Sequence, residues 1–250
     1  MDFKTIDLSI TDGLASVDQT VTITAGNTTA DITVAITNDA LVEAAETLSL
    51  TVTGFTARDA DVSLGTTLTA TADIADNDTA TVTIAKINDG TEPSTDGLFR
   101  VTQTAQSSTD TVITYAVTGT AGSTDFTALS GSVTITAGQT TADINVPVID
   151  ESLVEATETV IATLNGFSSG DADVTLGATV AATVDIADND NATVTLAKIN
   201  DGVEAAVPSN VLFRVTQTAA ASVDSVISYT VGGTATSGTD FTALSGSVTI

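Results

Sequence analysis

The sequence predicts an all-β protein made of tandem seven-stranded antiparallel β-sandwich domains, one complete and two partial. Two observations support this fold class. Apolar and polar residues alternate in short segments that are separated by turns, and the apolar residues are mostly Val, Ile, Ala and Leu set among many Thr. Alternation with period two is typical of strands that bury one face, and Val, Ile and Thr suit pleated, half-buried strands. The sequence shows no helical periodicity.

A long internal repeat organises the chain. The segment TVTIAKINDG at Thr81–Gly90 reappears as TVTLAKINDG at Thr193–Gly202, a shift of 193 − 81 = 112 residues. IADND at Ile74–Asp78 recurs at Ile186–Asp190 with the same shift. A repeat of this length is typical of a whole sandwich domain rather than a solenoid turn. We therefore expect the C-terminal part of one repeat at residues 1–78, a complete repeat at 79–190 and the N-terminal part of a third at 191–250. This arrangement predicts a fragment of a longer repetitive protein, whose first repeat lacks its first three strands.

Seven strands are predicted in the complete repeat, near residues 80–87, 98–104, 111–118, 132–136, 141–149, 158–164 and 179–187. If successive strands alternate in direction, the segments that follow the first, third, fifth and seventh strands share one end of the sandwich. These segments carry the acids Asp89, Glu92, Asp125, Asp150, Glu151, Glu155, Asp188 and Asp190. Ca²⁺ prefers six to eight oxygen ligands, and a chain without His or Cys offers little to transition metals. The sequence therefore predicts a Ca²⁺ site at this end, with a solvated acidic face as the alternative.

Composition excludes several classes of function. The chain has 250 residues, with 6 Lys and Arg against 32 Asp and Glu, and its net charge of −26 disfavours nucleic acid and anionic membranes as partners. The hydrophobic content of 42% is too high for a disordered acidic chain. No His or Cys is present to act as base or nucleophile, so we expect no enzymatic activity. No apolar run reaches the length of a membrane span, and the first residues do not resemble a signal peptide. We expect an extracellular or cell-surface location, with the export signal outside this sequence.

The stretch TDFTALSGSVTITAGQTTADINVPVIDESLVEATETV at Thr124–Val160, closed by IADND at Ile186–Asp190, resembles the Calx-beta repeat family. The resemblance covers the complete repeat and both partial ones. It implies a seven-stranded immunoglobulin-like sandwich with Ca²⁺ ligands at the acidic end. The implied ligands of the complete repeat are Asp125, Asp150, Glu151, Glu155, Asp188 and Asp190, with the Leu153 carbonyl as a further candidate. Those of the first repeat are Asp39, Glu43, Asp76 and Asp78, together with Asp2 and Asn38, and the third repeat keeps Asp240, Asp201 and Glu204.

Some positions depart from the family pattern. Asn189 stands between two acids where strong binders carry a third, Ser152 stands where another acid can occur, and Asn38 replaces an acid in the first repeat. Glu92 matches weakly, because the loop that carries it differs in length. Fewer acids imply weaker binding, or fewer ions at each site.

The resulting hypothesis is a non-catalytic, adhesin-type structural repeat that binds Ca²⁺ at domain boundaries and so stiffens an extended surface or secreted protein. The alternative is a Ca²⁺-sensing regulatory module, as in the sodium–calcium exchangers. A third hypothesis, an adhesin domain that binds a glycan or a protein, has little support because aromatic residues make up only 4% of the chain. The expected partners are Ca²⁺, the neighbouring repeats and an unidentified cell-surface or matrix target.

Overall fold

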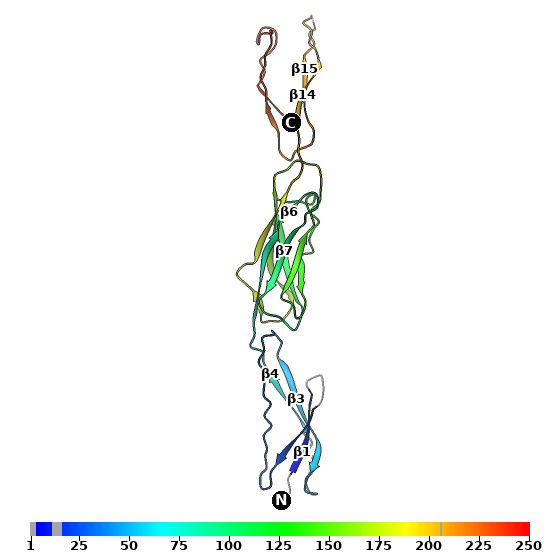
Figure 1. Ribbon diagram of the computed structural model, residues 1–250, viewed down its shortest axis with the longest axis vertical. Helices are drawn as coiled ribbons and strands as arrows, with labels where there is room; N and C mark the ends of the chain where they lie inside the picture. The colour runs from blue at the N-terminus through cyan, green and yellow to red at the C-terminus, as the bar shows by residue number, and fades with distance from the viewer. Residues whose placement is uncertain (1–3, 12–16, 206) are drawn as a thin grey trace.

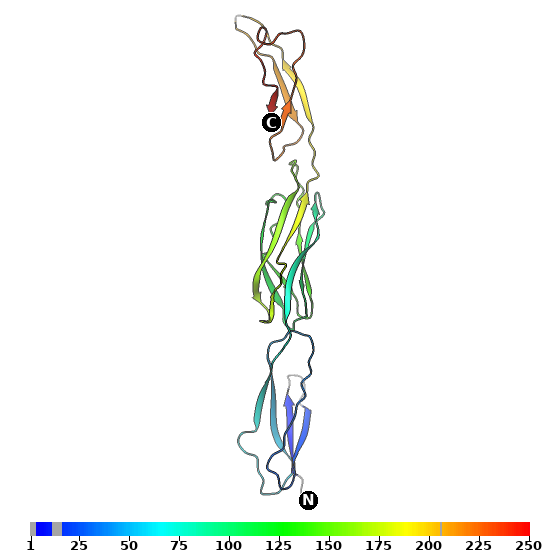
Figure 2. The same ribbon diagram turned by 90° about the vertical axis from the view of Figure 1, so that its left-hand side faces the viewer.

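The computed structural model describes residues 4–11, 17–205 and 207–250, with side chains described from residue 20 onward. These residues form three all-β lobes that follow one another along a long axis (Figures 1 and 2). The described residues contain no helix long and apolar enough to cross a bilayer. The boundaries expected after Asp78 and Asp190 stay predictions, and Asp2 lies outside the described residues.

The middle lobe is a sandwich of two sheets, which confirms the predicted fold class. One sheet has the strand order β10-β7-β5-β12 and the other β6-β13-β11-β8-β9. The strands are β5 (Ala80–Asn88), β6 (Gly90–Thr91), β7 (Gly97–Gln103), β8 (Thr111–Gly119), β9 (Ser132–Ile135), β10 (Thr141–Val146), β11 (Glu158–Ser169), β12 (Val174–Leu176) and β13 (Ala181–Ala187). The short strands β6 and β12 were not predicted, and they pair in parallel with β13 and β5.

Three predicted strand ends differ from the structure. The strand expected at 141–149 ends at Val146, because Pro147 has no N–H to donate to a ladder, and Val148 makes only an isolated bridge with Phe126. The strand expected at 158–164 continues to Ser169 through two register shifts against β8. The strand expected at 179–187 begins at Ala181.

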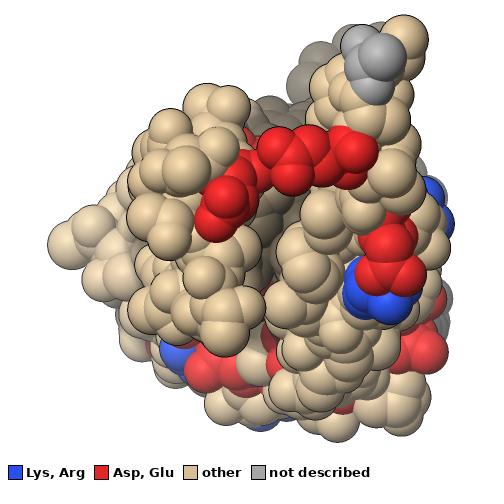
Figure 3. All heavy atoms as spheres, turned by 90° about the horizontal axis from the view of Figure 1, so that it is seen from above, with Lys and Arg blue, Asp and Glu red and all other residues tan. Residues whose placement is uncertain are grey.

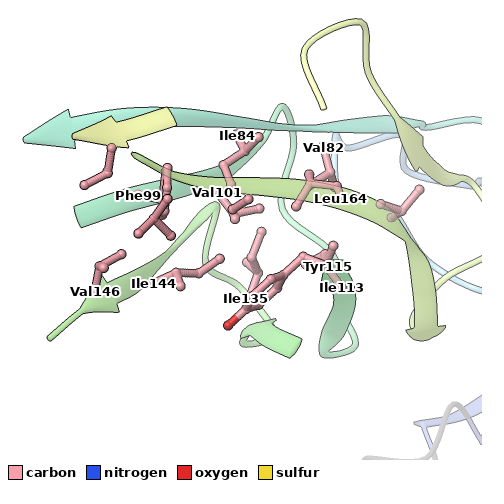
Figure 4. Close-up of a cluster of buried hydrophobic side chains, with 14 of the residues drawn as sticks. Val82, Ile84, Phe99, Val101, Ile113, Tyr115, Ile135, Ile144, Val146 and Leu164 are labelled. Atoms are coloured by element: carbon pink, nitrogen blue, oxygen red, sulfur yellow. The ribbon is translucent and has the colours of Figure 1, made fainter. Parts of the chain in front are cut away.

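The core of the middle lobe follows the period-two pattern of the sequence. Ala80, Val82 and Ile84 on β5 are buried, and so are Phe99 and Val101 on the neighbouring strand β7. Figure 4 shows how side chains from several strands gather between the sheets. Burial of apolar area, at about 25 cal/mol per Å², is the main force that holds such a sandwich together.

A close approach of two strands guides the chain to one end of the middle lobe. Strand β8 ends at Gly119, whose φ of +132° and whose lack of a Cβ let the backbone pass against the carbonyl of Thr159 on β11. The Thr120 hydroxyl accepts a hydrogen bond from the Thr159 amide at 2.9 Å, and the Thr120 amide donates one to the Thr159 hydroxyl at 3.2 Å. These contacts start the loop that carries Asp125.

The first lobe has a single sheet in the order β2-β1-β3-β4, made of β1 (Lys4–Thr11), β2 (Val17–Ile23), β3 (Glu46–Ala57) and β4 (Thr69–Ile74). The expectation that this lobe lacks its first three strands is wrong in one respect. Strand β1 lies between β2 and β3, which is the place that β8 takes between β9 and β11. Residues Lys4–Thr11 therefore supply a counterpart of β8 in the first lobe.

The third lobe pairs β14 (Val194–Asn200) with β15 (Leu212–Gln217), and β16 (Val226–Ser228) with β17 (Ser247–Thr249). Its apolar side chains are much more exposed than their counterparts in the middle lobe. Leu196 is 64% exposed and Phe213 57% exposed, whereas the matching Ile84 and Phe99 are buried. The same strand sequence is therefore buried only where further strands cover it.

This contrast gives a matched test of the core. We expect Phe99→Ala to lower the free energy of unfolding of the middle lobe by about 3–5 kcal/mol, because the ring is fully buried. Phe213→Ala should lower the free energy of unfolding of the third lobe by less than about 1 kcal/mol, because this ring is 57% exposed. Differential scanning calorimetry of the full chain measures both, and equal losses would contradict the assigned core.

Candidate metal centre

One end of the middle lobe, called here the acidic pole, gathers carboxylates from four chain segments. These segments follow β6, join β8 to β9, join β10 to β11 and follow β13. The carboxylates of the acidic pole are Glu92, Asp125, Asp150, Glu151, Glu155, Glu158, Asp188 and Asp190. The parallel pairing of β6 with β13 brings the segment after β6 into the group, because the Glu92 amide donates to the Ala187 carbonyl at 3.1 Å.

The first carboxylate group consists of Glu92, Asp188 and Asp190. One oxygen of each lies within 4.8 Å of the others. Glu92 is only 6% exposed, and its Oε2 atom is buried without a hydrogen-bond partner among the described residues. Burial raises the pKa of Glu92, and the charges of Asp188 and Glu151 raise it further. Burial and the charge of Asp188 likewise raise the pKa of Asp190.

The second group consists of Asp125, Glu155 and Glu158, again with one oxygen of each within 4.8 Å of the others. Burial raises the pKa of Glu158 to about 7, and the hydrogen bond with Asp125 adds to this effect. Burial alone would raise the pKa of Asp125, but hydrogen bonds from the Gly122 amide, Glu158 and the Thr124 hydroxyl lower it. Without a cation and below about pH 7, the proton of this pair therefore lies on Glu158 and the charge on Asp125.

The two groups share one small pocket, which is lined by Glu92, Asp125, Glu155, Glu158 and Asp188 together with Ala156 and Ile186. The Asp188 carboxylate links the two groups by accepting hydrogen bonds from backbone amides. Its Oδ2 accepts the Glu155 amide and its Oδ1 the Asp190 amide, each at 2.8 Å. The β10–β11 loop and the segment after β13 are thus held together before any ion arrives.

Four of the six ligands implied for the complete repeat lie in these groups, namely Asp125, Glu155, Asp188 and Asp190. The other two lie beside them. Glu151 Oε2 accepts the amides of Ser152 and Leu153, while its Oε1 is buried without a described partner. Asp150 is exposed and accepts a hydrogen bond from the Asn189 side chain at 3.1 Å. Asn189 therefore positions Asp150.

Sequence reasoning left Glu92 and Glu158 out of the ligand set. The place of Glu92 depends on strand β6, which has no periodic signal in the sequence. Glu158 opens strand β11, and the sequence pattern indicates only a strand residue there. Glu158 is the first residue of a strand that begins at the acidic pole, and this position in the sequence indicates that its carboxylate lies there. Asp89, by contrast, forms an ion pair with Lys86 at 2.9 Å and accepts the Asp185 amide.

The predicted sites of the other lobes are less complete. In the first lobe the Glu43 amide donates to Asp76 Oδ2 at 2.8 Å, as Glu155 does to Asp188. Asp39 is exposed, Asp78 is half-buried, and both three-carboxylate groups found among the described side chains lie in the middle lobe. In the third lobe the predicted acids Asp240, Asp201 and Glu204 are all exposed, and Asp201 is ion-paired with Lys198.

The described Lys and Arg side chains do not neutralise the acidic pole. The ion pairs among the described residues join Lys86 to Asp89 and Asp185, Arg100 to Asp143 and Lys198 to Asp201, and none involves an acid of the pole. Seen from above, the C-terminal end of the molecule likewise shows red acidic side chains beside fewer blue basic ones (Figure 3). A hard divalent cation fits this all-oxygen donor set, and the buried, unpartnered oxygens of Glu92, Glu151 and Asp190 are suited to bind it.

The pKa of Glu158 predicts how the metal-free lobe responds to pH. Its pKa rises from 4.5 to about 7 on folding, so the stability gained from its proton is complete below about pH 4.5 and is lost as pH rises through 7. In a chelator, the melting temperature of the middle lobe should therefore fall between pH 5 and pH 8. Glu158→Gln should remove most of this fall, whereas Asp173→Asn, in the β11–β12 turn, should keep it. If the melting temperatures of the wild type and of Glu158→Gln fall in parallel with pH, Glu158 is not the group that causes the fall.

Comparison with known proteins identifies the family. The sequence model of the Calx-beta domain matches residues 3–78, 86–190 and 201–250. A search of curated proteins found no match. Among solved structures, the apo form of the Calx CBD1 domain is 25% identical, with a TM-score of 0.37 over 44% of this chain and 99% of that one. The CBD12 structure from CALX1.2 is 18% identical, with a TM-score of 0.37 over 53% and 70% of the two chains. A two-domain protein of unknown function from Bacteroides fragilis is 8% identical, with a TM-score of 0.33 over 48% and 55%. Because the family model matches most of the chain, the protein belongs to the Calx-beta domain family.

Proposed function

We propose that the acidic pole of the middle lobe binds Ca²⁺. The observation that carries this proposal is the buried Glu92 Oε2, which has no described partner and belongs to a side chain that shares a 4.8 Å cluster with Asp188 and Asp190. A buried ionised carboxylate is strongly unfavourable unless it is paired or coordinates a metal. A bound cation removes this cost, and it also removes the repulsion that raises the pKa of Glu92 and Asp190.

Both carboxylate groups can contribute to binding. Each supplies three carboxylates, and further oxygens are available from Glu151, from backbone carbonyls and from water, which suits the six to eight ligands of Ca²⁺. Asp188 lines the pocket that the two groups share, so it is the residue through which they would act together. The set contains no nitrogen or sulfur ligand, and this disfavours transition metals.

The place of the acidic pole in the chain suggests what the ion does. Asp188 and Asp190 lie between the end of β13 at Ala187 and the start of β14 at Val194, where the middle lobe passes into the third. An ion bound there restrains this connection. The proposed function is therefore that of a binding and structural repeat, without a catalytic role, in an extended secreted or cell-surface protein.

Calorimetric titration of Ca²⁺ into the full chain tests the site. We expect heat of binding and a higher melting temperature of the middle lobe, because a ligand that binds only the folded state stabilises it. Glu92→Gln and Asp188→Asn should each weaken binding by about tenfold or more. Asp143→Asn, which alters an acid ion-paired with Arg100 away from the pole, should leave the affinity unchanged. The absence of both heat and thermal stabilisation would refute the proposal.

Small-angle scattering separates a spacer from a regulatory sensor. A spacer should keep its maximum dimension when Ca²⁺ is added and show only a narrower distribution of shapes. A large change in that dimension would instead favour the sensor hypothesis.

A further inference from the structure

A contact between successive lobes involves a valine of the loop that bears the acids. Val42 in the first lobe and Val154 in the middle lobe are separated by 154 − 42 = 112 residues, so they occupy the same position of the repeat. Val42 is 0% exposed. It belongs to a buried apolar cluster whose other buried members all lie between Ala80 and Ile186, in the middle lobe. Its side chain therefore completes the core of the lobe that follows its own.

The backbone of Val42 is also bonded to the middle lobe. Its amide donates to the Gln106 carbonyl at 2.9 Å, and its carbonyl accepts the Ser108 amide at 3.0 Å. Together these bonds form a parallel bridge with Ser107, in the loop between β7 and β8. The contact thus combines apolar burial with two hydrogen bonds.

The junction between the middle and third lobes repeats these hydrogen bonds, although Val154 is half-buried where Val42 is fully buried. The Val154 amide donates to the Ala220 carbonyl at 2.9 Å, and the Ser222 amide donates to the Val154 carbonyl at 3.0 Å. Val154 forms a parallel bridge with Ala221. The receiving sequences differ, Gln-Ser-Ser at 106–108 and Ala-Ala-Ser at 220–222, yet the hydrogen bonds are the same. Recognition by backbone groups explains how the junction tolerates divergence between repeats.

Each receiving loop is held in place by its own lobe. The Gln106 side chain donates to the Gly138 carbonyl at 2.7 Å, and the Gly138 amide donates to the Ser107 carbonyl at 2.9 Å. The Gln103 side chain donates to the Ala105 carbonyl at 2.8 Å, and Gln217 makes the matching bond to Ala219. The receiving edge is therefore preformed, which lowers the entropic cost of docking.

We propose that this contact, called here the valine clasp, is a docking site by which each repeat fixes the orientation of the next. The docking element is the valine of the loop before the long strand β3 or β11, and its partner is the β7–β8 loop of the following repeat or its equivalent. The hydrogen bonds and the apolar contact of the clasp include no carboxylate oxygen, so the clasp forms without a cation. In the middle lobe the adjacent Glu155 amide is bonded to Asp188, so Val154 and the acidic pole share one short segment. The Glu43 amide makes the matching bond to Asp76 in the first lobe.

Hydrogen exchange of the full chain, measured by NMR in the presence of a chelator, tests the clasp. The reporter is the Ser108 amide, whose acceptor is the Val42 carbonyl. We expect this amide to be protected in the wild type and to exchange at least about tenfold faster in Val42→Asp, which places a charge in an apolar core. Val42→Ala should accelerate exchange of the Ser108 amide by a smaller factor. This variant replaces Val42→Asp in the test if the Asp variant disturbs the first lobe.

Two control variants distinguish loss of the clasp from a general loss of stability. Val34→Asp, at a position 39% exposed in the same lobe, should leave Ser108 protected. Val154→Asp should accelerate Ser222 and leave Ser108 unchanged, while the amide of Val101 in β7 stays protected in every variant. An unprotected Ser108 in the wild type, or unchanged protection in both Val42 variants, would overturn the clasp whether or not Ca²⁺ binds.

Discussion

Repulsion between carboxylates at the acidic pole is the constraint that the apolar core of the middle lobe must outweigh. Acids from four segments meet there, and no Lys or Arg of the described residues pairs with them. The structure meets this constraint in part by hydrogen bonds to backbone amides and in part by the raised pKa of Glu92, Glu155 and Glu158. Protons are a poor solution near neutral pH, and a divalent cation is a better one. The group of carboxylates that is unfavourable without an ion is therefore suited to bind one.

The sandwich makes such an arrangement possible because its core carries the stability. Buried side chains on β5, β7, β8 and β11 hold both sheets together, and their ends project loops that cannot move far apart. The pairing of β6 with β13 adds Glu92 to the pole, and the close passage at Gly119 adds Asp125. The stabilising apolar contacts thus lie in the body of the lobe, while the repulsion between carboxylates is confined to one end, next to the following lobe.

Local pattern and repetition predicted most of the fold and part of the site. The 112-residue shift, the alternation of apolar residues and the parity of the loops led to the sandwich and to the end where the acids meet. The two residues of β6 carry no periodic signal, so only the three-dimensional pairing with β13 reveals the place of Glu92. In the sequence Glu158 has the pattern of a strand residue. Its raised pKa results from burial beside Asp125, which the sequence does not show. Val42 resembles any apolar loop residue until the middle lobe is seen to bury it.

The most direct test of the central claim is a crystal structure of the full chain grown with Ca²⁺, with anomalous scattering used to locate the ion. The account predicts an anomalous peak at the acidic pole, at about 2.3–2.6 Å from oxygens of Glu92 and Asp188. It also predicts that Glu92 Oε2, unpartnered in the metal-free chain, becomes a ligand. A pole that contains only water at saturating Ca²⁺, with Glu92 Oε2 bound to no ion, would contradict it.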